Sequence, residues 1–330
     1  MFQADSVKIT VLVENWIDML LADQSSPLDS GDHCVTRFGL IEHFDPKLVP
    51  PQAENGISLL VEATSGRHVL RVLFDVGLTG TVLEHNMRVF GVDPASIDHI
   101  VISHGHPDHF GGIHQFLGLA QRHVPLVTHV DAELPRYALM PDGRASPVYN
   151  ASFAFEHLDR SGASVVLARS PLDLGCGVFT TGEIPRVTSF EATSPPHRLG
   201  QPGLYQIAAD GTARRDEVMD EIALIVDVKG EGIVVMTGCS HAGVINTLLH
   251  AKSLCADRPI RAVLGGFHLG FPTTPRDNIG LTVEALRELE VATVVPMHCS
   301  GLHAHCHIER ELSAHYVQPA VGTVFHFGAR

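Results

Sequence analysis

The part of this chain that most constrains its fold is the run SHGHPDH at residues 103–109, which closes an apolar β-type stretch at 99–103. A neutral imidazole nitrogen and a carboxylate oxygen are both good ligands for a divalent cation. Two alternating histidines on an extended turn, His104 and His106, can direct their rings at one ion. The adjacent Asp108 and His109 then face a second ion. The run therefore predicts a two-metal centre at the end of a strand.

A polar loop that is rich in histidine by chance is the plain alternative to this metal site. A lone histidine would favour that interpretation. Here two alternating histidines and an Asp-His pair lie before Gly111-Gly112, and glycine supports the special backbone geometry of a tight turn. The spacing favours metal binding over chance.

Short β-type runs alternate with helical periodicity along the chain. The β-type runs cover 8–14, 57–63, 69–75, 99–103, 125–129, 164–168, 177–181, 222–228, 232–237, 261–265, 292–296 and 322–327. Helical periodicity covers 78–90, 111–122, 242–256 and 276–290. Each half begins with strands close together and then alternates strand with helix. This order predicts an α/β fold of the αββα type, two mixed β-sheets flanked by helices. No GxGxxG follows the first strand, so a dinucleotide site has no support.

The composition fits one large folded domain. Of 330 residues, 45% are hydrophobic and 18% are charged, which is enough apolar material for a substantial core. We predict a single domain over 1–330, with loop insertions near 44–56 and 141–203. The net charge of -14 argues against a nucleic-acid partner, because phosphates require a basic surface.

The start of the chain shows no basic segment followed by a long apolar stretch, and no run is long enough to span a membrane. The six cysteines lack the spacing of a disulfide framework, which favours a reducing cytoplasm. We therefore expect a cytoplasmic protein with no membrane partner and a small-molecule substrate. The sequence leaves an oligomer open.

The run at 103–109 resembles the metal-binding motif of the metallo-β-lactamase superfamily, and the resemblance extends over nearly the whole chain. It implies a metallo-β-lactamase sandwich and gives Asp75, after a strand, the task of orienting a ligand. Cys239 aligns with an acid or cysteine ligand, with His241 two residues on, and a thiolate suits zinc. Without the motif at 103–109, an ordinary turn acid would be the better interpretation of Asp75. As a single residue, Cys239 is equally well a buried structural thiol.

The resemblance also implies a late histidine ligand, for which the chain offers two candidates. We assign His298 to the metal and His268 to substrate contact. The histidine that usually completes the first metal site is missing, because the matching place reads TGEIPR at 181–186. Glu183 or His241 replaces it, or the first site is more open. We also expect Glu183, like Arg186, to contact the substrate.

Within the superfamily, the order of motifs resembles metal-dependent hydrolases of β-lactamase superfamily II. Some of these are named 7,8-dihydropterin-6-methyl-4-(β-D-ribofuranosyl)aminobenzene 5′-phosphate synthase. The motifs include FDVG at 74–77, GCSHAG at 238–243 and PMHCSG at 296–301. The chain departs from this subfamily at 54–58, which reads ENGIS, so the pathway-specific name is not carried over.

The leading interpretation is a hydrolase with two divalent ions, zinc first and manganese or iron as alternatives, acting on a phosphorylated, ester or lactone substrate. Asp108 would hold the attacking water, and His268 or His241 would steady the developing oxyanion. Arg186 pairs with a substrate anion or is an ordinary surface arginine, with equal weight. The alternatives are a synthase acting on a phosphoribosyl or pterin-type substrate and, in another class, a di-iron redox protein. A non-catalytic binding module and a nuclease are disfavoured.

Overall fold

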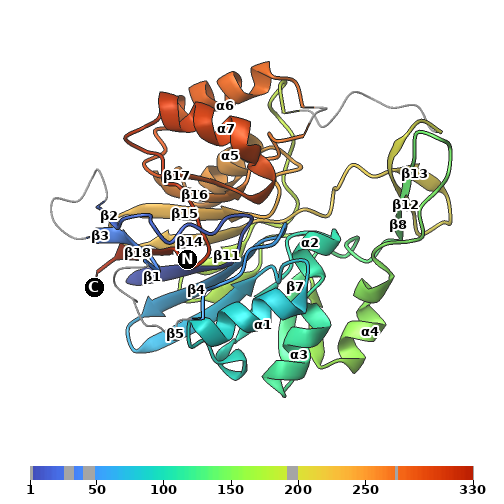
Figure 1. Ribbon diagram of the computed structural model, residues 1–330, viewed down its shortest axis with the longest axis horizontal. Helices are drawn as coiled ribbons and strands as arrows, with labels where there is room; N and C mark the ends of the chain where they lie inside the picture. The colour runs from blue at the N-terminus through green and yellow to red at the C-terminus, as the bar shows by residue number, and fades with distance from the viewer. Residues whose placement is uncertain (1–2, 26–32, 40–48, 192–199, 272–273, 330) are drawn as a thin grey trace.

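The computed structural model describes residues 3–25, 33–39, 49–191, 200–271 and 274–329. Two mixed β-sheets pack face to face, and helices cover the outer face of each (Figure 1). This architecture confirms the predicted αββα class. The elements match the predicted runs closely along most of the chain; the exceptions include short elements at 24–25, 33–36, 155–160 and 173–175 and the strands of a small third sheet.

The first sheet has nine strands and contains the N-terminal half of the fold. Its N-terminal strands pair antiparallel, whereas β5, β6, β7 and β9 run parallel. In spatial order the strands are β2 (Gln24–Ser25), β3 (His33–Thr36), β18 (Val324–Gly328), β1 (Ser6–Val13), β4 (Ser58–Ser65), β5 (His68–Phe74), β6 (His99–Val101), β7 (Val124–Thr128) and β9 (Ala163–Leu167).

The second sheet has six strands and contains most of the C-terminal half. β14 and β15 are antiparallel, and β15, β16 and β17 are parallel. In spatial order the strands are β10 (Asp173–Gly175), β11 (Val178–Thr180), β14 (Leu224–Val228), β15 (Gly232–Thr237), β16 (Ile260–Gly266) and β17 (Val294–Met297).

Helices form the two outer layers. α1 and α3 lie on the nine-stranded sheet, and α5, α6 and α7 lie on the six-stranded sheet (Figure 1). The helices are α1 (Gly80–Val89), α2 (Pro107–Phe110), α3 (Ile113–Ala120), α4 (Phe155–Arg160), α5 (Val244–Leu254), α6 (Asp277–Glu288) and α7 (Gly301–Glu311). Three 3₁₀ turns are η1 (Pro94–Ser96), η2 (Ala151–Phe153) and η3 (His298–Ser300).

Alternation along β1 shows how the sequence builds these layers. Val7, Ile9 and Val11 belong to the apolar core between the two sheets. Because successive side chains of a strand point to opposite faces, Lys8 and Thr10 face the outer side of the first sheet. The parallel strands of the second sheet are buried on both faces, which explains their continuous apolar runs.

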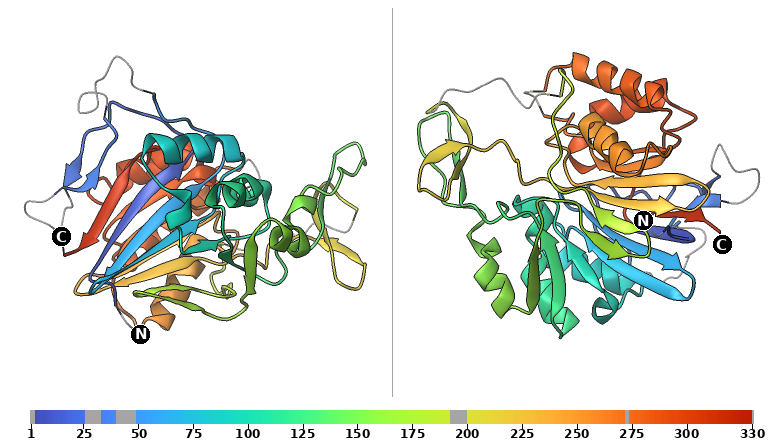
Figure 2. Two further views of the ribbon diagram at one scale, coloured as in Figure 1. Left: turned by 90° about the horizontal axis from the view of Figure 1, so that it is seen from below. Right: turned by 180° about the vertical axis from the view of Figure 1, so that it is seen from behind.

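A third sheet projects from one end of the sandwich (Figure 2). It consists of β13 (Ala213–Arg215), β12 (Gly203–Ile207) and β8 (Arg136–Leu139). The sequence did not predict it, because these strands are short and mostly half-buried or exposed, so they lack a long apolar run.

The predicted insertions contain both irregular and regular structure. Residues 44–48 and 192–199 lie outside the described residues. Within 141–203, β9, β10 and β11 are strands of the two main sheets, so only part of this segment is loop. Among the described helices, none is long and apolar enough to cross a membrane.

Candidate metal centre

The ends of six strands meet at one edge of the sandwich, and the predicted ligands lie there. The loop after β6 carries His104 and His106, and α2 then carries Asp108 and His109. His106 is the N-cap of α2 and Pro107 its first residue, a position where the fixed φ of proline fits a helix start. The chain therefore turns sharply and presents four ligand side chains within six residues.

Three imidazoles form a first triad, His104, His106 and His241, whose ligand atoms all lie within 4.8 Å of one another. Nε2 of His104 is 3.0 Å from Nδ1 of His106. The ring of His241 is 4.8 Å from that of His104, and its buried Nε2 has no hydrogen-bond partner among the described residues. Such an orphaned nitrogen fits a ligand to a divalent cation.

A second triad consists of Asp108, His109 and His298, whose ligand atoms again lie within 4.8 Å of one another. Nε2 of His298 is 3.1 Å from Oδ2 of Asp108, yet it makes no aligned hydrogen bond within the described part of the chain. Nε2 of His109 is 3.8 Å from Oδ1 of Asp108. Two imidazoles and one carboxylate in this arrangement fit a second divalent ion.

The thiol of Cys239 lies between the triads. Its Sγ is 3.1 Å from Nε2 of His109, and it groups with His104 and His109 on one side. On the other side it groups with His298 and Cys299. Cys299 was not among the predicted ligands, although its place next to His298 was the available signal. Two thiols beside imidazoles form a donor set that suits zinc.

Asp75 contacts the ring of His109, in the orienting position that the family resemblance implied for it. Its Oδ2 is 2.6 Å from Nδ1 of His109, and it accepts hydrogen bonds from the backbone and hydroxyl of Ser103 at 2.7 and 2.8 Å. Because Nδ1 of His109 contacts Asp75, the other ring nitrogen, Nε2, is left to face Asp108 and Cys239 at the candidate metal centre. Gly238 is required beside this network, since a Cβ there would lie 2.1 Å from the Ser103 hydroxyl.

A buried ion cluster at the base of the third sheet holds the His104–His106 loop. Nε of Arg136 donates to Asp216 at 2.8 Å and Nη2 donates to Asp220 at 2.5 Å. Asp220 accepts from the backbone of Gly105 at 2.9 Å, and Oδ2 of Asp216 is 3.7 Å from Nε2 of His106. Sequence reasoning missed Arg136, because its partners lie 80 and 84 residues away.

His298 is held by the end of β1. Both carboxylate oxygens of the buried Glu14 accept from its backbone N–H, at 3.0 and 3.1 Å. Asn15 donates to its carbonyl at 3.0 Å. These contacts fix His298 in the left-handed region, at φ +46°, which is costly for a residue other than glycine. Glu14 was also missed, although a polar residue at a strand end was the signal that marked Asp75.

Electrostatics keep three of the triad residues, His104, His241 and Asp108, in their metal-binding forms. Burial lowers the pKa of His104 and that of His241 well below the usual value, so both rings are neutral at pH 7. Burial raises the pKa of Asp108, but the nearby His109 and His298 lower it. The lowering is the larger effect, so the pKa of this carboxyl falls below its usual value. Asp108 is therefore a carboxylate at neutral pH.

Two residues predicted to contact the substrate, His268 and Arg186, lie outside both triads. The ring of His268 is 4.3 Å from that of His241 and stacks on Phe271 at 4.3 Å. Arg186 donates through Nη2 to the backbone carbonyl of Glu217 and, at 3.4 Å, to that of Val218. Its predicted substrate contact stays a prediction.

Glu183 does not belong to either triad. Its Oε1 is 3.0 Å from Nε2 of His129 and 2.6 Å from Nη1 of Arg169. Of the two candidates for the missing histidine of the first site, the structure therefore places His241, and not Glu183, beside His104 and His106.

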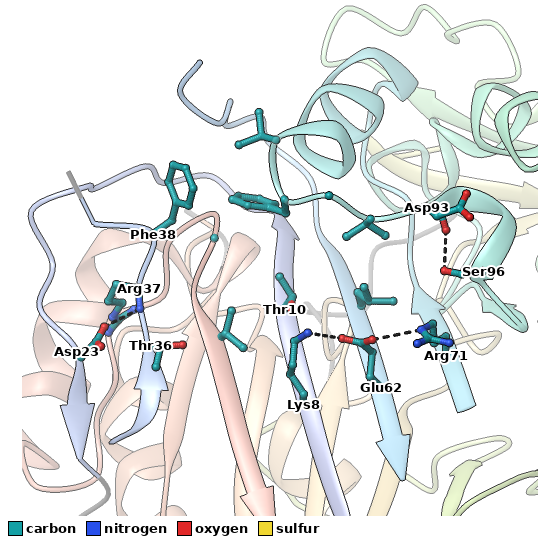
Figure 3. A pocket seen from close by; sticks show the side chains of 17 residues that line it. Lys8, Thr10, Asp23, Thr36, Arg37, Phe38, Glu62, Arg71, Asp93 and Ser96 are labelled. Carbon is teal, nitrogen blue, oxygen red and sulfur yellow. Dashed lines mark hydrogen bonds and ion pairs between the residues drawn. The ribbon is translucent and has the colours of Figure 1, made fainter. Parts of the chain in front are cut away.

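A separate cavity of about 860 Å³ lies on the outer face of the first sheet. In Figure 3, Glu62 lies between Lys8 and Arg71. Its carboxylate is 2.6 Å from Nζ of Lys8 and 3.2 Å from Nε of Arg71, so both cations are paired with the same carboxylate. Among the described residues that line it, there is no histidine or cysteine. The metal chemistry therefore belongs to the strand ends.

Comparisons with known proteins agree with this geometry. The sequence model of the metallo-β-lactamase superfamily matches residues 58–200. A curated relative from Methanocaldococcus jannaschii, named 7,8-dihydropterin-6-methyl-4-(β-D-ribofuranosyl)-aminobenzene-5′-phosphate synthase, is 29% identical over 84% of this chain and 92% of its own.

Solved structures share the fold. Tm1679, described as a metal-dependent hydrolase of the β-lactamase superfamily, is 26% identical, with a TM-score of 0.69 over 98% of this chain and 100% of its own. The metallo-β-lactamase fold protein YhfI from Bacillus subtilis is 14% identical, with a TM-score of 0.51 over 98% and 100% of the two chains. Together with the αββα sandwich, these similarities show that the chain has the metallo-β-lactamase fold and resembles the metallo-β-lactamase superfamily in sequence.

Proposed function

We propose that this protein is a metal-dependent hydrolase that acts on a small phosphorylated, ester or lactone substrate. The observation that carries the proposal is the convergence of two ligand triads, His104, His106 and His241 in one and Asp108, His109 and His298 in the other. Two sites that share a wall at Cys239 fit a centre for two ions. Such a pair supplies Lewis acidity and lowers the pKa of a coordinated water toward about 7.

Asp108 positions the attacking water in this proposal. Its carboxylate belongs to the second triad, and its lowered pKa keeps it ionised. An ionised carboxylate accepts a hydrogen bond from water and orients the attacking lone pair at the substrate. Asp108 thereby combines a ligand role with a positioning role.

His268 and Arg186 supply the groups that meet the substrate. Burial lowers the pKa of His268 to about 4, so the ring is neutral at pH 7 and can donate one N–H to an oxygen that gains charge. Arg186 carries a permanent positive charge on the loop after β11. It suits a phosphate or carboxylate remote from the bond that breaks.

The donor set favours zinc, with manganese or iron as alternatives. Imidazole and thiolate ligands dominate, and both bind zinc well. A carboxylate at the position of His106 would have favoured the di-iron alternative, but this position is an imidazole of the first triad.

A second candidate function is synthesis of a phosphoribosyl or pterin-type product. It is favoured by the curated relative named as such a synthase, which aligns over 84% of this chain. In a synthase, Arg186 and the metal centre would hold phosphate and the product would depend on an acceptor. Release of free acid or alcohol without any acceptor distinguishes hydrolysis from this alternative.

The test is hydrolysis by zinc-loaded and manganese-loaded protein of bis(4-nitrophenyl) phosphate, 4-nitrophenyl acetate and an N-acyl homoserine lactone. We expect turnover of at least one substrate, its loss with a chelator, and a loss of about 100-fold or more in His106→Ala. His303→Ala, at an exposed position of α7, is the matched control and should keep full activity. Chelator-resistant turnover, or none with any metal, would reject the hydrolase.

A further inference from the structure

The phenol of Tyr149 has a buried hydroxyl without a hydrogen-bond partner among the described residues. Its backbone N–H donates to the carbonyl of Arg136 at 3.0 Å, so the residue is fixed next to the base of the third sheet. Buried hydroxyls are nearly always paired, since an unpaired one loses its hydrogen bonds to water. A buried donor of this kind therefore calls for a partner that the described residues do not provide.

Tyr149 lies on the metal-centre side of the ion cluster. Its ring is 6.2 Å from that of His106, a member of the first triad. Burial and the charges of Asp216, Asp220 and Asp108 raise the pKa of its hydroxyl, and the charge of Arg136 lowers it. Asp108 belongs to the second triad. The phenol is thus close to the side of the centre where a substrate would bind.

Neighbouring carboxylates accept from other donors, and neither of them pairs with the phenol in the described part of the chain. Asp216 accepts from the backbone of Val218 at 2.9 Å and from Nε of Arg136 at 2.8 Å. Asp220 accepts from Nη2 of Arg136 and from the backbone of Gly105. Burial, reinforced by Asp216, raises the pKa of Tyr149, so the hydroxyl stays protonated and remains a donor at every working pH.

We propose that Tyr149 donates a hydrogen bond to an oxygen of the acyl or phosphoryl group bound at the metal centre. The inference rests on the proposed function and extends it to a substrate contact from outside the strand-end motifs. A donor at this place stabilises an oxygen more strongly as it gains negative charge. The substrate group therefore needs an oxygen that can accept a hydrogen bond from Tyr149 beside His106. A phosphate, a phosphodiester, an ester and a lactone each have such an oxygen.

The test compares Tyr149→Phe with the wild type as zinc-loaded full-length chains, using inorganic phosphate as the probe in titration calorimetry. We expect phosphate to bind about tenfold more weakly to Tyr149→Phe, the usual effect of one lost hydrogen bond to a charged group. Zinc content should not change, and the melting temperature should not fall, since the lost hydroxyl has no partner among the residues that the structure describes. Tyr137→Phe is the matched control and should bind phosphate like wild type. Tyr137 lies in β8 of the third sheet, and its ring stacks on that of Tyr205 in β12 at 5.5 Å.

Two outcomes would overturn the contact: equal phosphate affinity in wild type and Tyr149→Phe, or no phosphate binding by zinc-loaded wild type. A lower melting temperature in Tyr149→Phe at unchanged affinity would show a structural hydroxyl instead. Turnover of bis(4-nitrophenyl) phosphate is measured separately. Weaker phosphate binding by Tyr149→Phe, with no turnover of any of the three test substrates by either protein with zinc or manganese, keeps the contact and rejects the hydrolase. Turnover with equal kcat and equal phosphate affinity keeps the hydrolase and rejects the contact.

Discussion

Several candidate metal ligands of this centre are held by a second residue, and Asp75 is the clearest case. Its carboxylate engages Nδ1 of the buried His109 at 2.6 Å. Asp75→Asn keeps the shape but loses the charge that fixes the ring, so we expect metal affinity at the second triad to fall 10- to 100-fold. A competition titration against a chromogenic chelator measures it. Asp98→Asn, whose carboxylate accepts from Arg71 on the surface of the sheet, is the control, and equal affinity in both variants would contradict this role.

The first triad depends on His241 and not on Glu183. His241→Ala removes one of three imidazoles, so we expect loss of about one metal equivalent. Glu183→Gln changes only a half-exposed contact with Arg169 and His129 and should leave metal content unchanged. Elemental analysis of both variants measures this. Loss of metal in Glu183→Gln with full occupancy in His241→Ala would reverse the assignment.

The ligands could be predicted from the sequence, but most of the residues that hold them could not. His104, His106, Asp108 and His109 share one short run, and Cys239, His241 and His298 each follow a strand. Asp216 and Arg136 meet only in three dimensions, 80 residues apart in the chain. Nothing local marks either of them, since a buried arginine looks like a surface arginine until its partners are known.

Among the elements, the third sheet is coupled to the centre through the fully buried Arg136. Arg136→Met would leave the carboxylates of Asp216 and Asp220 buried without a cation, so we expect a loss of about 3–5 kcal/mol in unfolding free energy together with weaker metal binding. Urea unfolding measures the first and chelator competition the second. Arg144→Met breaks an ion pair at the exposed tip of the same region and should change neither. Equal stability of the two variants would refute the coupling.

Element prediction followed the strength of the apolar pattern. β15 and β16 are buried along their whole lengths, and their continuous apolar runs identified them. β8, β12 and β13 are short and leave many side chains half-exposed. Their sequences therefore do not show the alternation of apolar and polar residues that identifies a strand. Their pairing joins segments far apart in the chain, which no local signal reports.

For the whole molecule, the packing of α7 gives stability a pH dependence. Burial lowers the pKa of His305 to about 4, below the 6.5 of an unfolded chain. The unfolded state therefore binds more protons between pH 6.5 and 4, and stability falls as the pH falls through this window. We expect His305→Asn to flatten the dependence by up to about 1.4 kcal/mol per pH unit.

Urea unfolding of wild type and His305→Asn between pH 4 and 7.5 measures this difference. Other buried histidines titrate in both proteins, so only the difference in slope reports His305. Parallel curves with the same slope would show that His305 is as accessible to protons in the folded state as in the unfolded one.

The central claim, a centre for two ions, is tested most directly by metal content. Purified wild-type protein, supplemented with zinc, manganese or iron and then freed of excess metal, is measured by elemental analysis beside His106→Ala and His298→Ala. We expect about two ions per chain in wild type and about one in each variant, because each substitution opens one triad. Less than about half an equivalent in wild type after supplementation would contradict the claim and leave a scaffold that binds its ligand without metal.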